Sequence, residues 1–271
     1  MTGIRNLGMA IALVGGILGV VATGAPVQAE SLTIGAAPSL RAALQEIVPM
    51  FEKEYDAAVT VVYGPSRTMR KQIEQGAAID VFLPAAVGEA KKLQKEGLTL
   101  NGGPRIYAQT SLVLVMSATS RVLPAAFHDA QPDGATRMAL GDPKTSSLGE
   151  ITAQALAKFD PAHKSRFKLV HAAHAEGIVN LLQTGKADMG IIYRVDAINN
   201  PQVRIIDENP AGMHIPVLFG EAVVSTCRKA SLNVAEEFFE FITSPRIQKL
   251  LVKYGFDHGF DHGFDSVASN G

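Results

Sequence analysis

The stretch Val61-Val-Tyr-Gly-Pro-Ser66-Arg-Thr-Met-Arg-Lys-Gln-Ile-Glu-Gln-Gly76 has the pattern of a strand, a tight turn and the start of an amphipathic helix. The first N–H groups of a helix have no intrahelical partner, and the helix N-terminus carries partial positive charge. A serine hydroxyl beside such groups suits a bound anion. Serine is also a preferred N-cap residue, so this stretch alone leaves two interpretations open, a helix cap and an anion site.

On both sides of this stretch, short apolar strands alternate with amphipathic helical segments. This alternation is typical of an α/β fold with a parallel or mixed sheet. Ligands of open α/β sheets lie beyond the carboxyl ends of the strands, where the chain turns into a helix. Four such turns stand out, at residues 34–40 with Ser39, 63–68 with Ser66, 139–150 ahead of a helix at about Leu148, and 174–179. We expect them to form one site if the sheet brings them together.

Composition argues against several classes of protein. The chain has 25 Lys and Arg against 26 Asp and Glu, so it lacks the basic excess of a nucleic-acid-binding protein. A single cysteine, Cys227, allows no internal disulfide, and its apolar flank indicates a strand thiol rather than a nucleophile. Neither a Walker loop nor a Gly-x-Ser-x-Gly or His-Glu-x-x-His motif is present. An enzyme is therefore disfavoured.

The N-terminus has the pattern of an export signal. Arg5 precedes an uncharged run from Leu7 to about Gly24, and small residues precede Glu30. We predict a signal peptide over residues 1–29, cleaved after Ala29, and a periplasmic location. An uncleaved membrane anchor is the alternative, because the run approaches spanning length. Cleavage leaves 242 of 271 residues, enough for two modest α/β domains or one large one.

Six segments in order then match a known family. They are residues 37–40 (Ala-Pro-Ser-Leu), 64–76, 79–84 (Ile-Asp-Val-Phe-Leu-Pro), 141–143 (Gly-Asp-Pro), 190–197 (Gly-Ile-Ile-Tyr-Arg-Val-Asp-Ala) and 253–256 (Lys-Tyr-Gly-Phe). Together they resemble the periplasmic molybdate-binding proteins of ABC transporters over about residues 31–256.

The resemblance implies a type II periplasmic binding protein fold. Two α/β lobes are then joined by two crossing strands, at residues 111–116 and 215–224. Lobe one comprises residues 31–110 plus 223–256, and lobe two residues 111–222. A disordered tail follows at 257–271.

The resemblance also implies the ligand, the site and the partner. The ligand is molybdate or tungstate, held through its oxygens with no cofactor and no cation-binding residue. Its oxyanion-binding groups are the hydroxyls and N–H groups of Ser39 and Ser66, the amides of Leu148 and Ile178, and the hydroxyl of Tyr193. The partner is a membrane permease of an ABC transporter, and the protein itself is a monomer without enzymatic activity.

The residue types suit an oxyanion without a proton. Every group around such a dianion should donate a hydrogen bond, as Ser and Tyr hydroxyls and backbone N–H groups do. Hydrogen bonds to a charged acceptor contribute roughly 1.5–3 kcal/mol each. A protonated phosphate also needs an acceptor carboxylate, and none of the four turns has one at a matching position, because Asp142 and Glu176 suit turn and cap roles.

Other ligands stay open as alternatives. Sulfate shares the charge and shape of molybdate, and phosphate is similar. A ferric-ion binder of the same fold generally has neighbouring Tyr ligands, whereas Tyr193 lies between Ile192 and Arg194. Porphobilinogen deaminase, an enzyme with this fold, holds its cofactor on a loop Cys, and the strand-like flank of Cys227 argues against it.

Four features depart from the family or stand apart from the site. Arg67 follows Ser66 where the family has a small residue, and it is either a solvated side chain or an added counterion. Leu148 is bulkier than the family's residue. His171 and His174 are interpreted as loop or surface residues. The repeat at residues 255–265, rich in Gly, Phe, Asp and His, is interpreted as disordered, although His and Asp can ligate metals.

Overall fold

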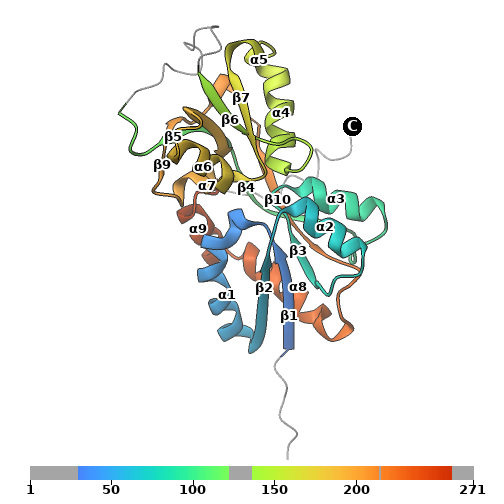
Figure 1. The fold of residues 1–271 in the computed structure, drawn as a ribbon. Coiled ribbons are helices and arrows are strands. Elements are labelled where there is room, and N and C mark those ends of the chain that lie inside the picture. Colours follow the sequence, from blue (N-terminus) through green and yellow to red (C-terminus); the bar gives the residue numbers. More distant parts are fainter. Residues whose placement is uncertain (1–29, 122–135, 214, 258–271) are drawn as a thin grey trace, which may run out of the picture.

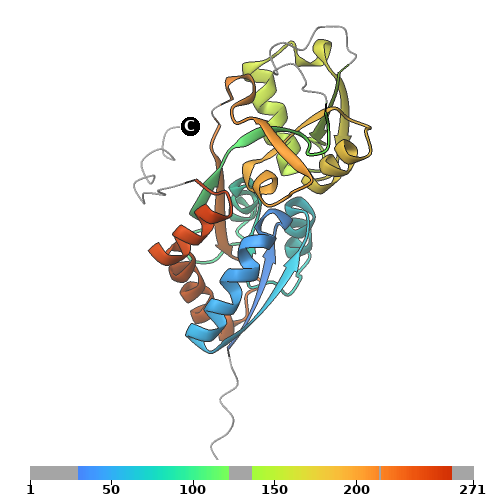
Figure 2. The same cartoon turned by 90° about the vertical axis from the view of Figure 1, so that its left-hand side faces the viewer.

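The computed structural model describes residues 30–121, 136–213 and 215–257 of the chain. It has two α/β lobes, each built on a five-stranded sheet (Figures 1 and 2). The elements in chain order are β1 (Glu30–Ala36), η1 (Pro38–Leu40), α1 (Arg41–Tyr55), β2 (Ala57–Tyr63), α2 (Ser66–Glu74), β3 (Val81–Leu83), α3 (Val87–Lys95), β4 (Arg105–Thr110), β5 (Leu112–Ser117), β6 (Arg137–Gly141), α4 (Ser147–Phe159), α5 (His163–Arg166), β7 (Lys168–Ala172), α6 (Ala175–Gln183), β8 (Met189–Tyr193), α7 (Arg194–Ile198), β9 (Val203–Asp207), η2 (Pro210–Gly212), β10 (Val217–Val223), η3 (Lys229–Ser231), α8 (Leu232–Thr243) and α9 (Pro245–Lys253).

The first lobe contains a mixed sheet in the order β2-β1-β3-β10-β4. Strand β1 is parallel to β2 and to β3, whereas β10 is antiparallel to β3 and β4. Helix α1 buries Leu44, Ile47 and Phe51 at a spacing of three and four residues, which places them on one helix face. The Phe51 ring packs edge-on against Phe238 of α8 at a centroid distance of 5.2 Å. Aromatic packing thus joins the N-terminal and C-terminal helices of this lobe.

The second lobe repeats this plan with the order β7-β6-β8-β5-β9. Strand β6 is parallel to β7 and β8, and β5 is antiparallel to β8 and β9. In each lobe, three parallel strands therefore lie together with an antiparallel strand beside them. Each of these parallel strands is followed by a turn and a helix, and turns from the two lobes meet in the middle of the molecule (Figure 1).

The chain passes between the sheets twice. It leaves the first sheet at Ser111, between β4 and β5, and returns between β9 and β10. These passages confirm the predicted pair of lobes joined by crossing segments. The sheet pairing differs from the predicted division in one respect, because β10 pairs with β3 and β4 of the first sheet although residues 217–222 are predicted in lobe two. The other lobe boundaries stay a prediction.

The remaining domain predictions concern the two ends of the chain, a signal peptide and a disordered tail. The predicted signal peptide at 1–29 and residues 258–271 of the predicted tail lie outside the described residues. Asp257, the first residue of that tail, is held in place, because its N–H donates to the Gln109 carbonyl at 2.9 Å and its Oδ2 accepts from the Gln109 side chain at 3.1 Å. No helix among the described residues is long and apolar enough to span a membrane.

Candidate functional site

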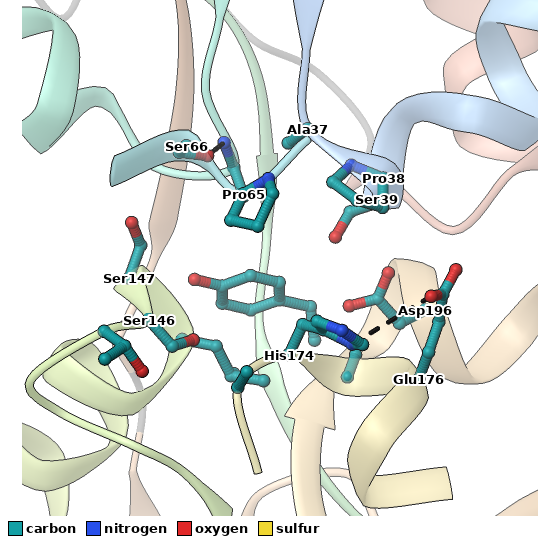
Figure 3. A pocket seen from close by; sticks show the side chains of 16 residues that line it. Ala37, Pro38, Ser39, Pro65, Ser66, Ser146, Ser147, His174, Glu176 and Asp196 are labelled. Carbon is teal, nitrogen blue, oxygen red and sulfur yellow. Dashed lines mark hydrogen bonds and ion pairs between the residues drawn. The ribbon is translucent and has the colours of Figure 1, made fainter. Parts of the chain in front are cut away.

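A cavity of about 90 Å³ lies where the two lobes meet (Figure 3). Cavities that hold drug-sized ligands measure roughly 300–1,000 Å³, so this one has room for a small ion rather than a sugar or peptide. Its walls consist of Ala37, Pro38, Ser39, Pro65, Ser66 and Ala85 from the first lobe, and Thr145, Ser146, Ser147, Leu148, Ala173, His174, Ala175, Glu176, Tyr193 and Asp196 from the second. Among these described residues, none is Lys or Arg.

Three α-helices begin at the cavity wall. Helix α2 begins at Ser66, α4 at Ser147 and α6 at Ala175. The first N–H groups of each helix have no intrahelical partner, and together with the helix dipole they give the cavity a positive potential. The cavity is therefore suited to an anion although no cationic side chain lines it.

Ser66 uses its hydroxyl for the cavity rather than for its helix. The N-cap of α2 is Pro65, and no side chain caps that helix end. The Oγ of Ser66 instead accepts a hydrogen bond from the N–H of Ala85 at 3.0 Å (Figure 3). Because Oγ acts as the acceptor in this bond, the hydroxyl proton can be donated elsewhere. Of the two interpretations open for Ser66, the structure excludes the helix cap.

Ser39 faces the second lobe across the cavity. It lies in η1, which has no side-chain cap. Its hydroxyl lies close enough to the carboxyl group of Asp196, in α7 of the second lobe, to lower the pKa of that group. Figure 3 shows the two side chains facing each other from opposite walls.

Leu148 brings a backbone donor to the cavity. Ser146 caps α4, with its Oγ accepting from the N–H of Gly149 at 3.3 Å. A Cβ atom on Gly149 would lie 2.4 Å from the Asp142 carbonyl carbon, so only glycine lets α4 begin this close to the end of β6. The Leu148 N–H, in the first turn, has no partner within the helix. The bulky Leu148 side chain is buried in the hydrophobic core.

Ile178 is not brought to the cavity with the other predicted residues. Its side chain is buried, and its N–H donates to the His174 carbonyl at 3.2 Å. The residues of this turn that line the cavity are His174, Ala175 and Glu176. His174 is exposed at the surface, as predicted, but it also lines the cavity. It is the N-cap of α6, and its Nδ1 accepts from the Gly177 N–H at 3.3 Å. Histidine is not among the preferred N-cap residues, so its residue type gave no signal for this role, although residues 174–179 were predicted to enter a helix.

Tyr193 lies at the end of β8 and lines the cavity. The residue is 2% exposed, and its buried hydroxyl has no hydrogen-bond partner. Burial raises the pKa of Tyr193 well above its ordinary value, and the nearby carboxylates of Asp196 and Glu150 raise it further. The hydroxyl therefore stays protonated and can donate a hydrogen bond.

Asp196 is a cavity residue that sequence reasoning missed. It lies three residues after Tyr193, in α7, and its buried Oδ2 has no hydrogen-bond partner. Burial raises the pKa of Asp196 to about 7; the nearby Ser39 hydroxyl lowers it, and the charge of Glu176 raises it. The site is thus not composed of donors alone. The signal available was the Asp within residues 190–197, which follows Tyr193 by about one helical turn.

Arg67 bridges the lobes outside the cavity. Its Nη2 lies 2.8 Å from Oε2 of Glu150 in α4, and its Nη1 donates to the carbonyl of Lys144. Lys92 of α3 approaches the same Glu150 oxygen at 3.7 Å. Arg67 is therefore neither solvated away from the protein nor a counterion that lines the cavity. The described residues contain no cluster of three or more His, Cys, Asp or Glu suited to a metal ion.

Residues 32–257 match the bacterial extracellular solute-binding proteins. The chain belongs to this family. The family is one of solute-binding proteins rather than enzymes, in keeping with Cys227, which does not line the cavity and whose pKa is raised to about 12 by burial and by Asp80.

Three solute-binding proteins show the likeness. YvgL of Bacillus subtilis, described as an ABC transporter substrate-binding lipoprotein, is 30% identical over 83% of this chain and 86% of its own length. The molybdate-binding protein ModA of Haemophilus influenzae is 28% identical over 83% of this chain and 89% of its own. The structure of the periplasmic molybdate-binding protein of Azotobacter vinelandii matches with a TM-score of 0.68 at 23% identity, covering 84% of this chain and 99% of that protein. The predicted resemblance and the predicted type II fold are confirmed.

Proposed function

We propose that this protein captures molybdate or tungstate outside the cytoplasm and delivers it to the membrane permease of an ABC transporter. The observation that carries the proposal is the small cavity between the lobes, lined by hydroxyls and helix N-termini without Lys or Arg. The likeness to ModA supports molybdate as the anion, and YvgL, the relative with 30% identity, supports the broader assignment to ABC transport.

The proposed donors come from both lobes. Ser39 and Ser66 are in the first lobe, and Leu148 and Tyr193 are in the second. The N–H groups of Ala175 and Glu176 serve in place of that of Ile178, because they begin α6 and line the cavity. An anion bound to all of these donors holds the lobes together.

A shell of neutral donors suits transport. Hydrogen bonds to a charged acceptor contribute roughly 1.5–3 kcal/mol each, so several of them offset the desolvation of the anion. When the lobes separate, neutral donors regain water without leaving an unpaired charge behind. A buried cationic side chain would remain as a costly unpaired charge.

One observation favours a second candidate ligand, an oxyanion that carries a proton, such as hydrogen phosphate. Asp196 offers the cavity a carboxylate oxygen without a hydrogen-bond partner, and such an oxygen can accept the proton of the anion. Sulfate shares the charge and shape of molybdate and also stays a candidate. Ferric ion is disfavoured, since the cavity wall contains one tyrosine.

Export and oligomeric state belong to the same proposal. The predicted signal peptide at residues 1–29 delivers the chain to the periplasm, where it acts as a monomer. Mass spectrometry of the secreted protein tests cleavage after Ala29, because the cleaved N-terminus begins at Glu30.

Thermal unfolding of residues 30–271 with molybdate, tungstate, sulfate, phosphate or ferric citrate tests the ligand. A ligand at a hundred times its dissociation constant adds about 2.7 kcal/mol to the free energy of unfolding, which is on the order of 5–10 °C for a chain of this size. We expect this shift with molybdate and tungstate alone. A shift with sulfate, phosphate or iron and none with molybdate would overturn the assignment.

A further inference from the structure

The carboxyl group of Asp196 is placed where a bound anion would meet a negative charge. It lines the cavity together with Tyr193 and the start of α6. One of its oxygens is buried without a partner, and the hydroxyl of Ser39 from the opposite lobe faces the side chain (Figure 3). An ionised carboxylate at this position would repel a bound dianion.

The groups that face Asp196 do not neutralise it. Glu176 and His174 at the start of α6 share its cavity, and the negative charge of Glu176 opposes ionisation of Asp196. Arg194, on the same helix, interacts with Glu208 and with the Gly255 carbonyl. Arg41 of α1 borders an adjacent depression shared with Asp196, and its guanidinium lies 4.0 Å from the centre of the Tyr63 ring.

We propose that Asp196 links anion binding to a proton: the complex holds one proton between the carboxyl group of Asp196 and the bound oxyanion, directly or through the hydroxyl of Ser39. This inference rests on the proposed function as an oxyanion-binding protein. The proton comes from solvent when a fully ionised anion binds, and it arrives with the anion when the anion is itself protonated.

Protonation removes the negative charge of Asp196, which repels the anion, and makes its carboxyl group a hydrogen-bond donor. An ionised Asp196 accepts the Ser39 proton and leaves the serine oxygen, rather than its proton, for the anion. A protonated Asp196 donates to Ser39 Oγ, so that the Ser39 hydroxyl is free to donate to the anion. The same proton thus removes a charge repulsion and restores a predicted ligand.

The sign of the pH dependence follows from linkage. The anion binds the protonated form more tightly, so its affinity is full below the pKa of the free protein and decreases above it. The free-protein pKa of about 7 for Asp196 places this change near neutral pH. In the limit of a single linked proton, the dissociation constant rises about tenfold for each pH unit above that value.

Calorimetric titration with molybdate and with sulfate at pH 6, 7, 8 and 9 tests the linkage, because neither anion takes up a proton in this range. Repeating the pH 8 titration in buffers of different ionisation enthalpy counts the protons. We expect uptake of about one proton at pH 8 in the wild type. Asp196→Asn supplies a permanent amide donor, and we expect it to bind with little dependence on pH and no proton uptake.

Glu176→Gln is the matched control, since it removes the other carboxylate that lines the cavity. It should keep the uptake of about one proton at pH 8, with the pH dependence shifted to lower pH because the charge of Glu176 raises the pKa of Asp196. Absence of proton uptake in the wild type at pH 8, or an unchanged pH dependence in Asp196→Asn, would overturn the inference. If Asp196→Asn does not fold, the wild-type proton count decides alone. If sulfate binds and molybdate does not, the molybdate assignment fails. The proton uptake measured on sulfate binding then still tests the role of Asp196. Binding of neither anion at any pH overturns both.

Discussion

The role of the Ser66 hydroxyl depends on a residue that lies far from it in the sequence. From sequence alone it can be a helix cap or an anion ligand. In the structure the Ser66 Oγ accepts a hydrogen bond from the Ala85 N–H. The proton of the Ser66 hydroxyl can therefore be donated to another group. The assignment needed the position of residue 85, which lies beyond β3 and which local sequence around Ser66 does not predict.

Ser66→Ala should weaken binding of the anion by about 10- to 100-fold, since it removes one hydrogen bond to a charged acceptor worth roughly 1.5–3 kcal/mol. It also leaves the Ala85 N–H unpaired, so a modest loss of stability is expected. Ser244→Ala is the control, because the Ser244 hydroxyl donates to the Phe241 carbonyl at 2.7 Å outside the cavity. Calorimetric titration with molybdate compares the two, and an equal affinity for both variants would contradict the role of Ser66.

Tyr193→Phe should weaken binding by a similar factor without lowering the stability of the free protein, because the hydroxyl has no partner there. Tyr107→Phe is a matched control: its hydroxyl is also buried and unpartnered but lies outside the cavity. Dissociation constants and melting temperatures of both variants make the comparison. A Tyr193→Phe protein that binds as the wild type does would remove Tyr193 from the site.

The sequence predicted Ser39 and Ser66 from turns that directly follow strands, and the family resemblance added Leu148 and Tyr193. All four lie at the cavity. Ile178 was predicted with them but does not line the cavity, because α6 begins at Ala175 with His174 as its cap. Asp196 was missed because its significance depends on burial and on Ser39 from the other lobe.

Helices α2 and α4 approach each other across the cavity entrance. Arg67 follows the cavity residue Ser66 in α2, and its partner Glu150 lies two residues after Leu148 in α4. The Arg67 side chain is 21% exposed and that of Glu150 is 38% exposed. Glu89, buried in α3, forms ion pairs with Arg67 at 3.7 Å and with Lys92 at 2.8 Å. It therefore helps to hold in place the two cationic side chains that face Glu150.

Arg67→Ala should therefore speed release of the anion and raise its dissociation constant about two- to fivefold, since partly exposed ion pairs contribute on the order of 0.5–1 kcal/mol. Arg70→Ala is the control, because Arg70 pairs with Glu74 and Glu89 of its own lobe. Stopped-flow displacement of molybdate measures the release rate. An equal effect of the two substitutions would show that Arg67 does not act by bridging the lobes.

At the scale of elements, periodicity predicted the alternation of strands and helices, and the resemblance predicted the two lobes. Neither fixed which sheet each strand joins. Strand β10 is an apolar run that suits either sheet, and only its pairing with β3 and β4 assigns it to the first. Long-range pairing of this kind depends on the whole chain rather than on local pattern.

The sheet of the first lobe contains a buried acid. Glu221 of β10 is fully buried, and neither of its carboxylate oxygens has a hydrogen-bond partner. Arg105 of β4 approaches Oε2 only to 3.8 Å. Burial raises the pKa of Glu221 from 4.5 to about 8, with Arg105 lowering it and Glu236 and Glu240 raising it.

A raised pKa makes the folded state hold a proton that the unfolded chain has lost. The contribution of Glu221 to stability is full below pH about 4.5, decreases as pH rises toward about 8, and is constant above that. Glu221→Gln should therefore be more stable than the wild type at pH 8, by on the order of a few kcal/mol, and this advantage should shrink at pH 5. Urea unfolding at both pH values measures it. A stability difference that does not change with pH would contradict the assignment.

The most direct test of the whole account is the position of the anion itself. Tungsten scatters X-rays anomalously, so crystals grown with tungstate locate the ion without reference to the protein. The account predicts one strong anomalous peak in the cavity between the lobes, with the tungstate oxygens within about 3 Å of the Ser39, Ser66 and Tyr193 hydroxyls and the Leu148 N–H. A peak outside this cavity, or an ion held directly by Lys or Arg side chains, would contradict it.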